Sequence, residues 1–123
     1  MNVTELGEVQ LRFAELVWAN APVSSGALVK LCEKELGWKK STTYTVLRKL
    51  CDKGLFENEN GTVKAKLTRE QYDAAKSGEL VNGRFGGSLP AFIAAFVSAN
   101  PISGRDADEI RAIIDAYKKE TGQ

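Results

Sequence analysis

A change from helical to extended patterning lies within residues 41–67, which read STTYTVLRKLCDKGLFENENGTVKAKL. Residues 41–53 repeat apolar side chains at helical spacing, and Gly54 follows at a position where helices commonly end. Beyond Gly54, two short extended runs flank Asn60-Gly61, which is the strongest short-range signal for a β-hairpin. This segment therefore predicts a helix followed directly by a hairpin.

Two more helices are predicted upstream of this segment. The first starts at Thr4-Glu5, because a hydroxyl and a carboxylate suit the positive end of a helix, and it ends before Pro22. Its apolar residues recur along one helical face: Val9, Phe13, Leu16 and Val17. The second helix is capped by Ser24-Ser25 and stops at Gly37. Three helices and then a hairpin are the element order of a winged helix-turn-helix domain, whose third helix enters the major groove of DNA.

The rest of the chain is predicted to be helical. Residues 68–71, Thr-Arg-Glu-Gln, match a capping box, so a fourth helix begins there. A short helix spans residues 88–99 until Asn100-Pro101 interrupts it, and Ser103 caps a last helix. Between them, glycines predict a loose joint: Gly78, Gly83, Gly86 and Gly87. The predicted fold class is mostly α with a small β-hairpin wing, a winged helix-turn-helix followed by C-terminal helices.

Composition narrows the range of functions. The 123 residues fit one compact domain with a short appendage, and the formal net charge is only +1. The absence of His excludes Ser-His and Cys-His nucleophile pairs, His-ligated metals and imidazole proton shuttles. Cys32 and Cys51 are too few for a disulfide framework, and we expect them to be small buried hydrophobes. We therefore expect no enzyme, no cofactor and no metal site.

No targeting or membrane-spanning segment is expected. The N-terminus lacks a basic region followed by an apolar run, which a secretory signal would need. The longest apolar stretch, residues 91–97, is far shorter than the ~20 residues of a membrane span. The sequence therefore predicts a cytoplasmic protein that does not use a membrane.

Positive charge is concentrated around the third predicted helix. Residues 38–53 contain five cations and one carboxylate, and the helix face opposite the apolar stripe combines cations with hydroxyls. Such side chains contact phosphates and base edges in DNA grooves. In the alternative interpretation Ser41 is only a helix cap and the charges form a solvated face, but three Thr in a short helix form helix poorly and favour a binding role. The candidate DNA-binding residues are Lys39, Lys40, Ser41, Thr42, Tyr44, Thr45, Arg48 and Lys49.

Residues 41–50, followed by Lys53-Gly54-Leu55, resemble the recognition helix of the penicillinase/methicillin-resistance repressor family. Trp18, residues 68–72 and the region from residue 88 are similar to other parts of that family, so the resemblance covers nearly the whole chain. It implies a homodimeric transcriptional repressor whose winged helix binds a palindromic DNA operator and whose C-terminal helices form the dimer. The chain is accordingly divided into a winged-helix DNA-binding domain, residues 1–67, and a helical dimerisation region, residues 68–123.

The apolar residues after residue 88 fit the dimer that the resemblance implies. They exceed what a short helical pair can bury by itself, and their alternative role is to pack back onto the winged helix. The candidate dimerisation residues are Leu89, Phe92, Ile93, Phe96, Ile110, Ile113, Ile114 and Tyr117.

The chain departs from the family in three places. In the antibiotic-resistance members a membrane sensor protease triggers cleavage at an Asn-Phe bond. The candidate cleavage bond here is Ala95-Phe96, so a sensor protease is a candidate partner, although the missing Asn argues against induction by proteolysis. The paired C-terminal cysteines of the copper-responsive branch are absent. The wing tip carries Glu59 and no Arg, so Lys64 and Lys66 are the candidate wing contacts to DNA.

We interpret the chain as a dimeric DNA-binding repressor without catalytic activity, whose recognition helix is residues 41–53. Two other functions stay open. One is a winged-helix module that binds a partner protein through the Thr-rich helix, and the other is a ligand-sensing regulator with an effector pocket near the glycine-rich joint. The sequence does not identify the operator, the regulated genes or the inducing signal.

Overall fold

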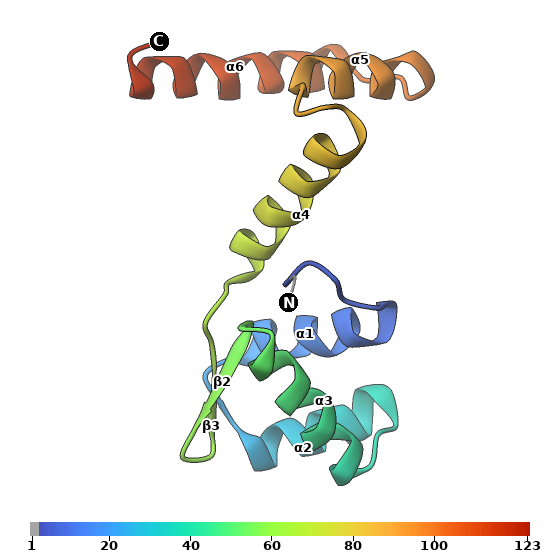
Figure 1. Ribbon diagram of the computed structural model, residues 1–123, viewed down its shortest axis with the longest axis vertical. Helices are drawn as coiled ribbons and strands as arrows, with labels where there is room; N and C mark the ends of the chain where they lie inside the picture. Colours follow the sequence, from blue (N-terminus) through green and yellow to red (C-terminus); the bar gives the residue numbers. More distant parts are fainter. Residues whose placement is uncertain (1–2) are drawn as a thin grey trace. The chain divides into compact units, whose positions relative to one another are not determined.

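The computed structural model describes residues 3–123, which form six helices and a three-stranded sheet (Figure 1). The chain divides into two compact units, the first ending at Glu79 and the second spanning Leu80–Gln123. The predicted class, mostly α with a winged helix, is confirmed. The first unit holds α1 (Glu8–Asn20), β1 (Val23–Ser24), α2 (Ser25–Leu36), α3 (Lys40–Asp52), β2 (Phe56–Glu59) and β3 (Thr62–Ala65). Helix α4 (Arg69–Arg84) begins in the first unit and ends in the second, which also holds α5 (Leu89–Ala99) and α6 (Gly104–Thr121).

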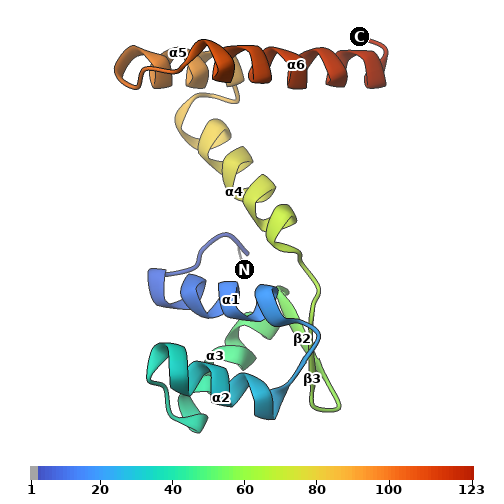
Figure 2. The ribbon, with the colours of Figure 1, turned by 180° about the vertical axis from the view of Figure 1, so that it is seen from behind.

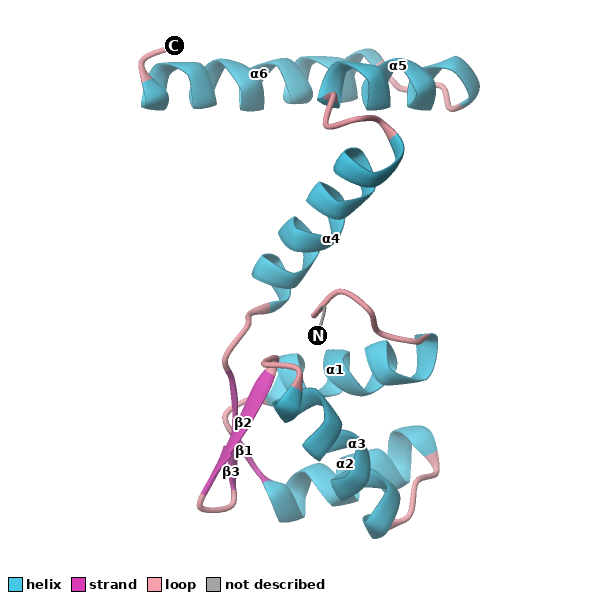
Figure 3. Ribbon diagram, viewed as in Figure 1, coloured by secondary structure: helices cyan, strands magenta, loops and turns pink. Residues whose placement is uncertain are grey.

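The sheet is antiparallel, with strand order β1-β3-β2 (Figure 3). The predicted Asn-Gly turn joins β2 to β3, and both of its residues have positive φ, 52° at Asn60 and 85° at Gly61. Such backbone angles match the right-handed twist of a two-residue hairpin. Strand β1, which pairs Val23 with Val63, was not predicted, because two residues are too few to show an alternating pattern.

The start of the first helix was predicted wrongly. Helix α1 begins at Glu8, and Thr4 lies in a turn before it with 2% of its surface exposed. The Thr4 hydroxyl donates to the Glu79 carboxylate on α4, and the Lys76 ammonium donates to the Thr4 carbonyl at 3.1 Å. Thr4 is therefore occupied by a contact with α4 rather than by capping. Val9, predicted on the buried face, lies in the first turn of the shortened helix and is exposed.

Local capping signals were more informative for the other helices. Ser24 caps α2, Ser88 caps α5 and Ser103 caps α6, each accepting a hydrogen bond from a backbone N–H three residues on. Thr68 and Gln71 form the reciprocal bonds of a capping box at the start of α4. The predicted joint is shorter than expected, because Gly78 and Gly83 lie within α4 and only Gly86 and Gly87 of this group have positive φ.

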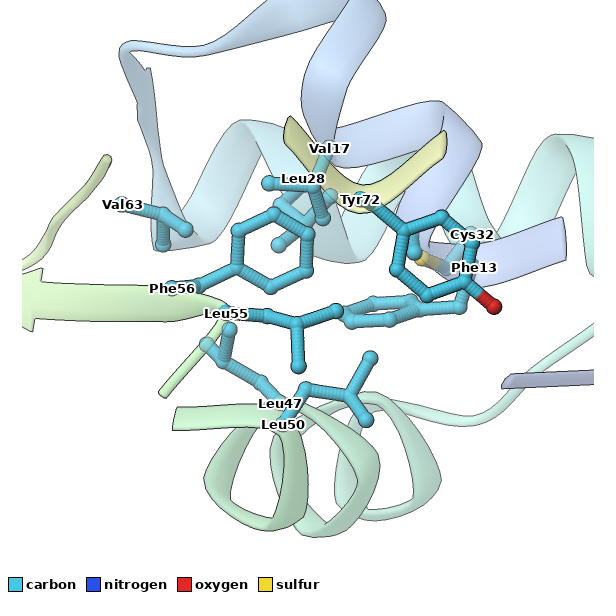
Figure 4. Packing of buried hydrophobic residues seen from close by; sticks show 11 residues of the cluster. Phe13, Val17, Leu28, Cys32, Leu47, Leu50, Leu55, Phe56, Val63 and Tyr72 are labelled. Atoms are coloured by element: carbon cyan, nitrogen blue, oxygen red, sulfur yellow. The ribbon is translucent and has the colours of Figure 1, made fainter. Parts of the chain in front are cut away.

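The core of the first unit lies between the three helices and the hairpin. Figures 1 and 2 show α1, α2 and α3 gathered on one side of the hairpin β2–β3. In Figure 4, Leu47 and Leu50 point from α3 toward Leu55 and the rest of the buried cluster. Because these two leucines and Thr43 are buried, the opposite face of α3 is left to solvent.

The first turns of α4 belong to this core. Tyr72 is buried, its ring lies 5.4 Å from the Trp18 ring, and the Trp18 indole N–H donates to the Leu67 carbonyl at 2.9 Å. Burial, followed by the nearby carboxylates of Asp73, Glu79 and Glu15, raises the pKa of Tyr72. The compact unit therefore extends beyond residue 67 into the helix that follows the wing.

Candidate nucleic-acid interface

Helix α3 presents a polar, positively charged face to solvent. Its inner face buries Thr43, Leu47 and Leu50, as the helical pattern predicted, and Val46 is half-buried beside them. Its outer face exposes most of the predicted binding residues and their neighbour Asp52. The exposed candidates are Lys39, Lys40, Ser41, Thr42, Thr45, Arg48 and Lys49. The fold thus places these side chains together on one accessible surface, which we call the α3 outer face.

The cations of the α3 outer face are available to an external anion. Three ion pairs occur among residues 3–123, and they join Lys64 to Glu59, Arg69 to Glu15 and Arg105 to Glu109. The four cations on α3 and its N-cap take part in none of them. The first turn of α3 carries no carboxylate, and its N-cap residue Lys39 makes no side-chain capping bond. Positive side chains and the positive end of a helix therefore coincide at this point.

The hydroxyls of α3 are partly used within the helix. Thr45 Oγ1 donates to the Ser41 carbonyl at 2.9 Å, and Thr43 Oγ1 donates to the Lys39 carbonyl at 3.3 Å. A hydroxyl that has donated its proton keeps its oxygen as an acceptor, and the methyl group of Thr stays free for apolar contact. On the exposed face, Thr45 can therefore accept a hydrogen bond from a base or contact a thymine methyl.

Two predicted contacts have other partners in the structure. Tyr44 is half-buried, and its hydroxyl donates to Ser25 Oγ at 3.2 Å. In the wing, Lys64 forms an exposed ion pair with Glu59 at 3.2 Å, whereas Lys66 is exposed and makes no ion pair among the described residues. Of the two wing candidates, Lys66 is thus the freer to meet a phosphate.

The second unit leaves a large apolar surface exposed. Ile113 and Tyr117 are 66% and 56% exposed, and among the predicted dimerisation residues only Phe92 is half-buried, between the rings of Phe85 and Phe96. Helices α5 and α6 contain no buried residue, so the second unit does not bury these side chains by itself. Three further apolar residues of this unit are exposed and were not predicted as dimerisation residues: Leu80, Val97 and Ile102. Val97 lies on the same helix as several of the predicted residues, and its apolar side chain could have identified it from the sequence.

The Ala95-Phe96 bond lies within α5 and both residues are exposed. Helical backbone has to unwind before a protease can bind it in extended form. Cleavage at this bond stays an untested prediction.

Both cysteines and the hollow at the base of the wing lie in the first unit. Burial raises the pKa of the Cys32 thiol, and a hydrogen bond with Thr43 lowers it by less. Burial, followed by the nearby carboxylates of Asp52 and Glu57, raises the pKa of the Cys51 thiol. Among residues 3–123 no group of three or more His, Cys, Asp or Glu is placed to hold a metal ion. The best-formed hollow lies in the first unit, at the base of the wing, where Trp18, Ala65 and Arg69 contribute to its wall. None of the joint glycines lines it.

No single helix of residues 3–123 is both long enough and apolar enough to cross a membrane. Helices α4 and α5 satisfy the length and composition criteria only when taken together, as a pair broken between them.

Comparison with known proteins agrees with this geometry. The family model of the penicillinase repressors matches residues 6–116, from just before α1 into the last helix. The penicillinase repressor of Bacillus licheniformis is 22% identical over 120 residues, which cover 94% of this chain and 94% of that protein. The match therefore includes the winged helix, the α3 outer face and the exposed apolar helices in one alignment. The chain belongs to the penicillinase repressor family, a family of transcriptional repressors.

Proposed function

We propose that this protein is a dimeric repressor that binds a palindromic DNA operator through α3. The observation that carries the proposal is the α3 outer face, where cations without intramolecular ion pairs lie beside exposed hydroxyls on the third helix of a winged helix. In this fold the third helix is the element that enters the major groove. Arg48 lies on the exposed face and can donate two parallel hydrogen bonds to a guanine, whereas Lys39 and Lys40, at the helix start, suit phosphates.

Two identical recognition helices are needed to read a palindrome, and the second unit offers a surface for pairing. Most of its exposed apolar residues belong to α5 and α6, and burying them against the same residues of a second copy satisfies two-fold symmetry. The proposal includes no catalytic step, no cofactor and no metal. It places the protein in the cytoplasm with its DNA.

The test is selection of binding sites by the purified full-length protein from a random-sequence duplex library. We expect enrichment of an inverted repeat and protection of both half-sites in a footprint. Because cation–phosphate contacts release counterions, affinity should fall steeply as salt rises. If no sequence is enriched, or if the enriched sites are single half-sites bound by monomers, the proposal is wrong.

The protein-binding module is the second candidate function, because hydroxyls and cations can also face an acidic protein surface. It predicts no enriched duplex at low salt. A ligand-sensing role would need a pocket at the glycine-rich joint, and the hollow lined by Trp18, Ala65 and Arg69 does not include these glycines. A sensor protease is a further candidate partner, although the Ala95-Phe96 bond lacks the Asn of the family's cleavage site.

A further inference from the structure

Ser25, the first residue of α2, is bonded to both the wing and the recognition helix. Its backbone N–H donates to the Gly61 carbonyl in the wing turn at 2.8 Å. Its side-chain oxygen accepts a hydrogen bond from the Tyr44 hydroxyl on α3 at 3.2 Å. Ser24, one residue earlier, pairs with Thr62 in the sheet and caps α2. A two-residue segment thus joins the wing turn, the start of α2 and the middle of α3.

These bonds add to the contacts that fix the wing turn. The hairpin pairs with β1 and buries Phe56 and Val63, whereas its tip carries a hydrogen bond from the Gly61 N–H to Asn58 Oδ1 and an exposed Lys64–Glu59 ion pair, a kind of pair that contributes little. The Ser25–Gly61 bond connects the turn itself to the helical body. The orientation of Ser25 is in turn restricted by its bond to Tyr44, which is packed at the edge of the core.

Tyr44 differs from the other predicted DNA-binding residues in its surroundings. Thr45 and Arg48 are exposed, whereas Tyr44 is half-buried and its one hydroxyl proton is already donated within the protein. Making a phosphate contact with that proton would break the bond to Ser25. Its position therefore fits a structural link better than a direct DNA contact.

We propose that Tyr44 is a positioning residue, which acts through Ser25 to hold the wing turn and the start of α2 in register with α3. This inference rests on the proposed DNA-binding function. It assigns Ser25 a role that no local sequence signal indicated, and it replaces the direct contact expected from Tyr44. The α3 outer face and Lys66 then approach DNA as one rigid surface.

The test compares Tyr44→Phe, Ser25→Ala and the double variant with the wild-type chain. The DNA probe is the duplex that the wild-type protein enriches from a random library, and Ser77→Ala on α4 is the matched control for loss of an exposed hydroxyl. Loss of one hydrogen bond should weaken duplex binding by about two- to tenfold. If the two residues act through each other, the affinity of the double variant for the duplex should equal that of the single variant that binds more weakly. Ser25→Thr, which keeps the hydroxyl, should restore wild-type affinity.

The coupling between the two substitutions separates positioning from direct contact. Two results would mean that Tyr44 contacts DNA itself. In one, the losses of affinity from the two substitutions add; in the other, Tyr44→Phe binds the duplex more weakly while Ser25→Ala keeps wild-type affinity. Wild-type affinity of every variant would also overturn the proposal.

A measurement without DNA distinguishes this proposal from the proposed function. Hydrogen exchange of the Ser25 amide reports its bond to Gly61, and Tyr44→Phe should accelerate that exchange while Ser77→Ala leaves it unchanged. If exchange accelerates but the wild-type chain enriches no duplex, DNA binding is wrong and the link between Tyr44 and the wing stands. Unchanged exchange in Tyr44→Phe contradicts the link, whatever the DNA result.

Discussion

Arg48 and Lys40 are both exposed cations of α3, but their side chains suit different parts of DNA. The guanidinium of Arg48 has a planar fork that matches the two acceptors on the major-groove edge of guanine. The Lys40 ammonium is a compact charge in the first turn of the helix, and such a charge suits phosphates in any sequence. Neither cation loses an intramolecular ion pair when it is removed, so both substitutions report on the bound state.

Arg48→Ala should weaken binding to the selected duplex by about 1–3 kcal/mol and relax the preference at one base pair of each half-site. Lys40→Ala should weaken selected and scrambled duplexes by the same factor and reduce the salt slope. Titrations of both duplexes at two salt concentrations measure these effects. Wild-type affinity and specificity in both variants would show that α3 is not the recognition helix.

Thr4→Val tests a buried hydroxyl that does not belong to the α3 outer face. The substitution keeps the shape of the side chain but removes the donor to Glu79, leaving a carboxylate of α4 with one partner fewer. We expect the free energy of unfolding to fall by about 1–3 kcal/mol. Chemical denaturation measures the change, and Thr121→Val, which removes an exposed hydroxyl at the end of α6, is the control. Equal stability of Thr4→Val and the wild type would contradict a structural role for this contact.

Threonine also shows what the sequence could and could not predict. Thr68 was predicted as a cap because its partner Gln71 is three residues away, within the reach of a local pattern. Thr4 was mistaken for a cap because its partner Glu79 is 75 positions along the chain. The outer face of α3 was predictable because a helix has a fixed period, so the buried leucines determined which side chains were exposed. The hydrogen bond between Tyr44 and Ser25 joins two helices, so the local sequence pattern of neither helix could predict it.

At the scale of elements, α4 has two different environments. Its first turns carry Tyr72, which is packed against Trp18, and Arg69, which pairs with Glu15 at 3.2 Å. From Leu80 onward the helix belongs to the second unit. The predicted division at residues 67 and 68 followed the capping box, which marks where a helix starts but not what that helix packs against. The stability of the winged helix should therefore depend on residues beyond 67.

Tyr72→Ala should lower the free energy of unfolding of the first unit by about 3 kcal/mol, because it leaves a cavity beside Trp18 and Phe56. A fragment that ends at residue 67 loses the same ring and should be less stable than one that ends at residue 79. Denaturation of the two fragments, followed by Trp fluorescence, measures the difference. Equal stability would show that α4 contributes nothing to the winged-helix core.

At the scale of the whole molecule, the two units differ in how completely they bury their apolar side chains. The first has a cluster of fully buried residues that includes Phe13, Leu50 and Phe56. In the second, α5 and α6 contain no buried residue. An exposed apolar surface of this extent is typical of an association site in a protein that is otherwise stable in water. Association of the second unit should therefore be separable from folding of the first.

Phe96→Asp tests that separation. Phe96 lies on α5 with Phe92 one turn before it, and no charged residue occurs from Leu89 to Val97, so a carboxylate here enters an uninterrupted apolar surface. Truncating a buried Phe costs about 3–5 kcal/mol, and a two-fold interface suffers the loss in both copies. We expect a monomer by sedimentation at micromolar concentration, with the circular dichroism and thermal unfolding of the winged helix retained. Ser98→Asp adds the same charge two residues along α5, at a position that is exposed and not apolar, and should remain dimeric.

Binding to a single half-site should survive in the Phe96→Asp monomer, whereas binding to the full palindrome should weaken, because linked half-sites no longer raise the effective concentration. A Phe96→Asp variant that stays dimeric would show that α5 does not form the interface.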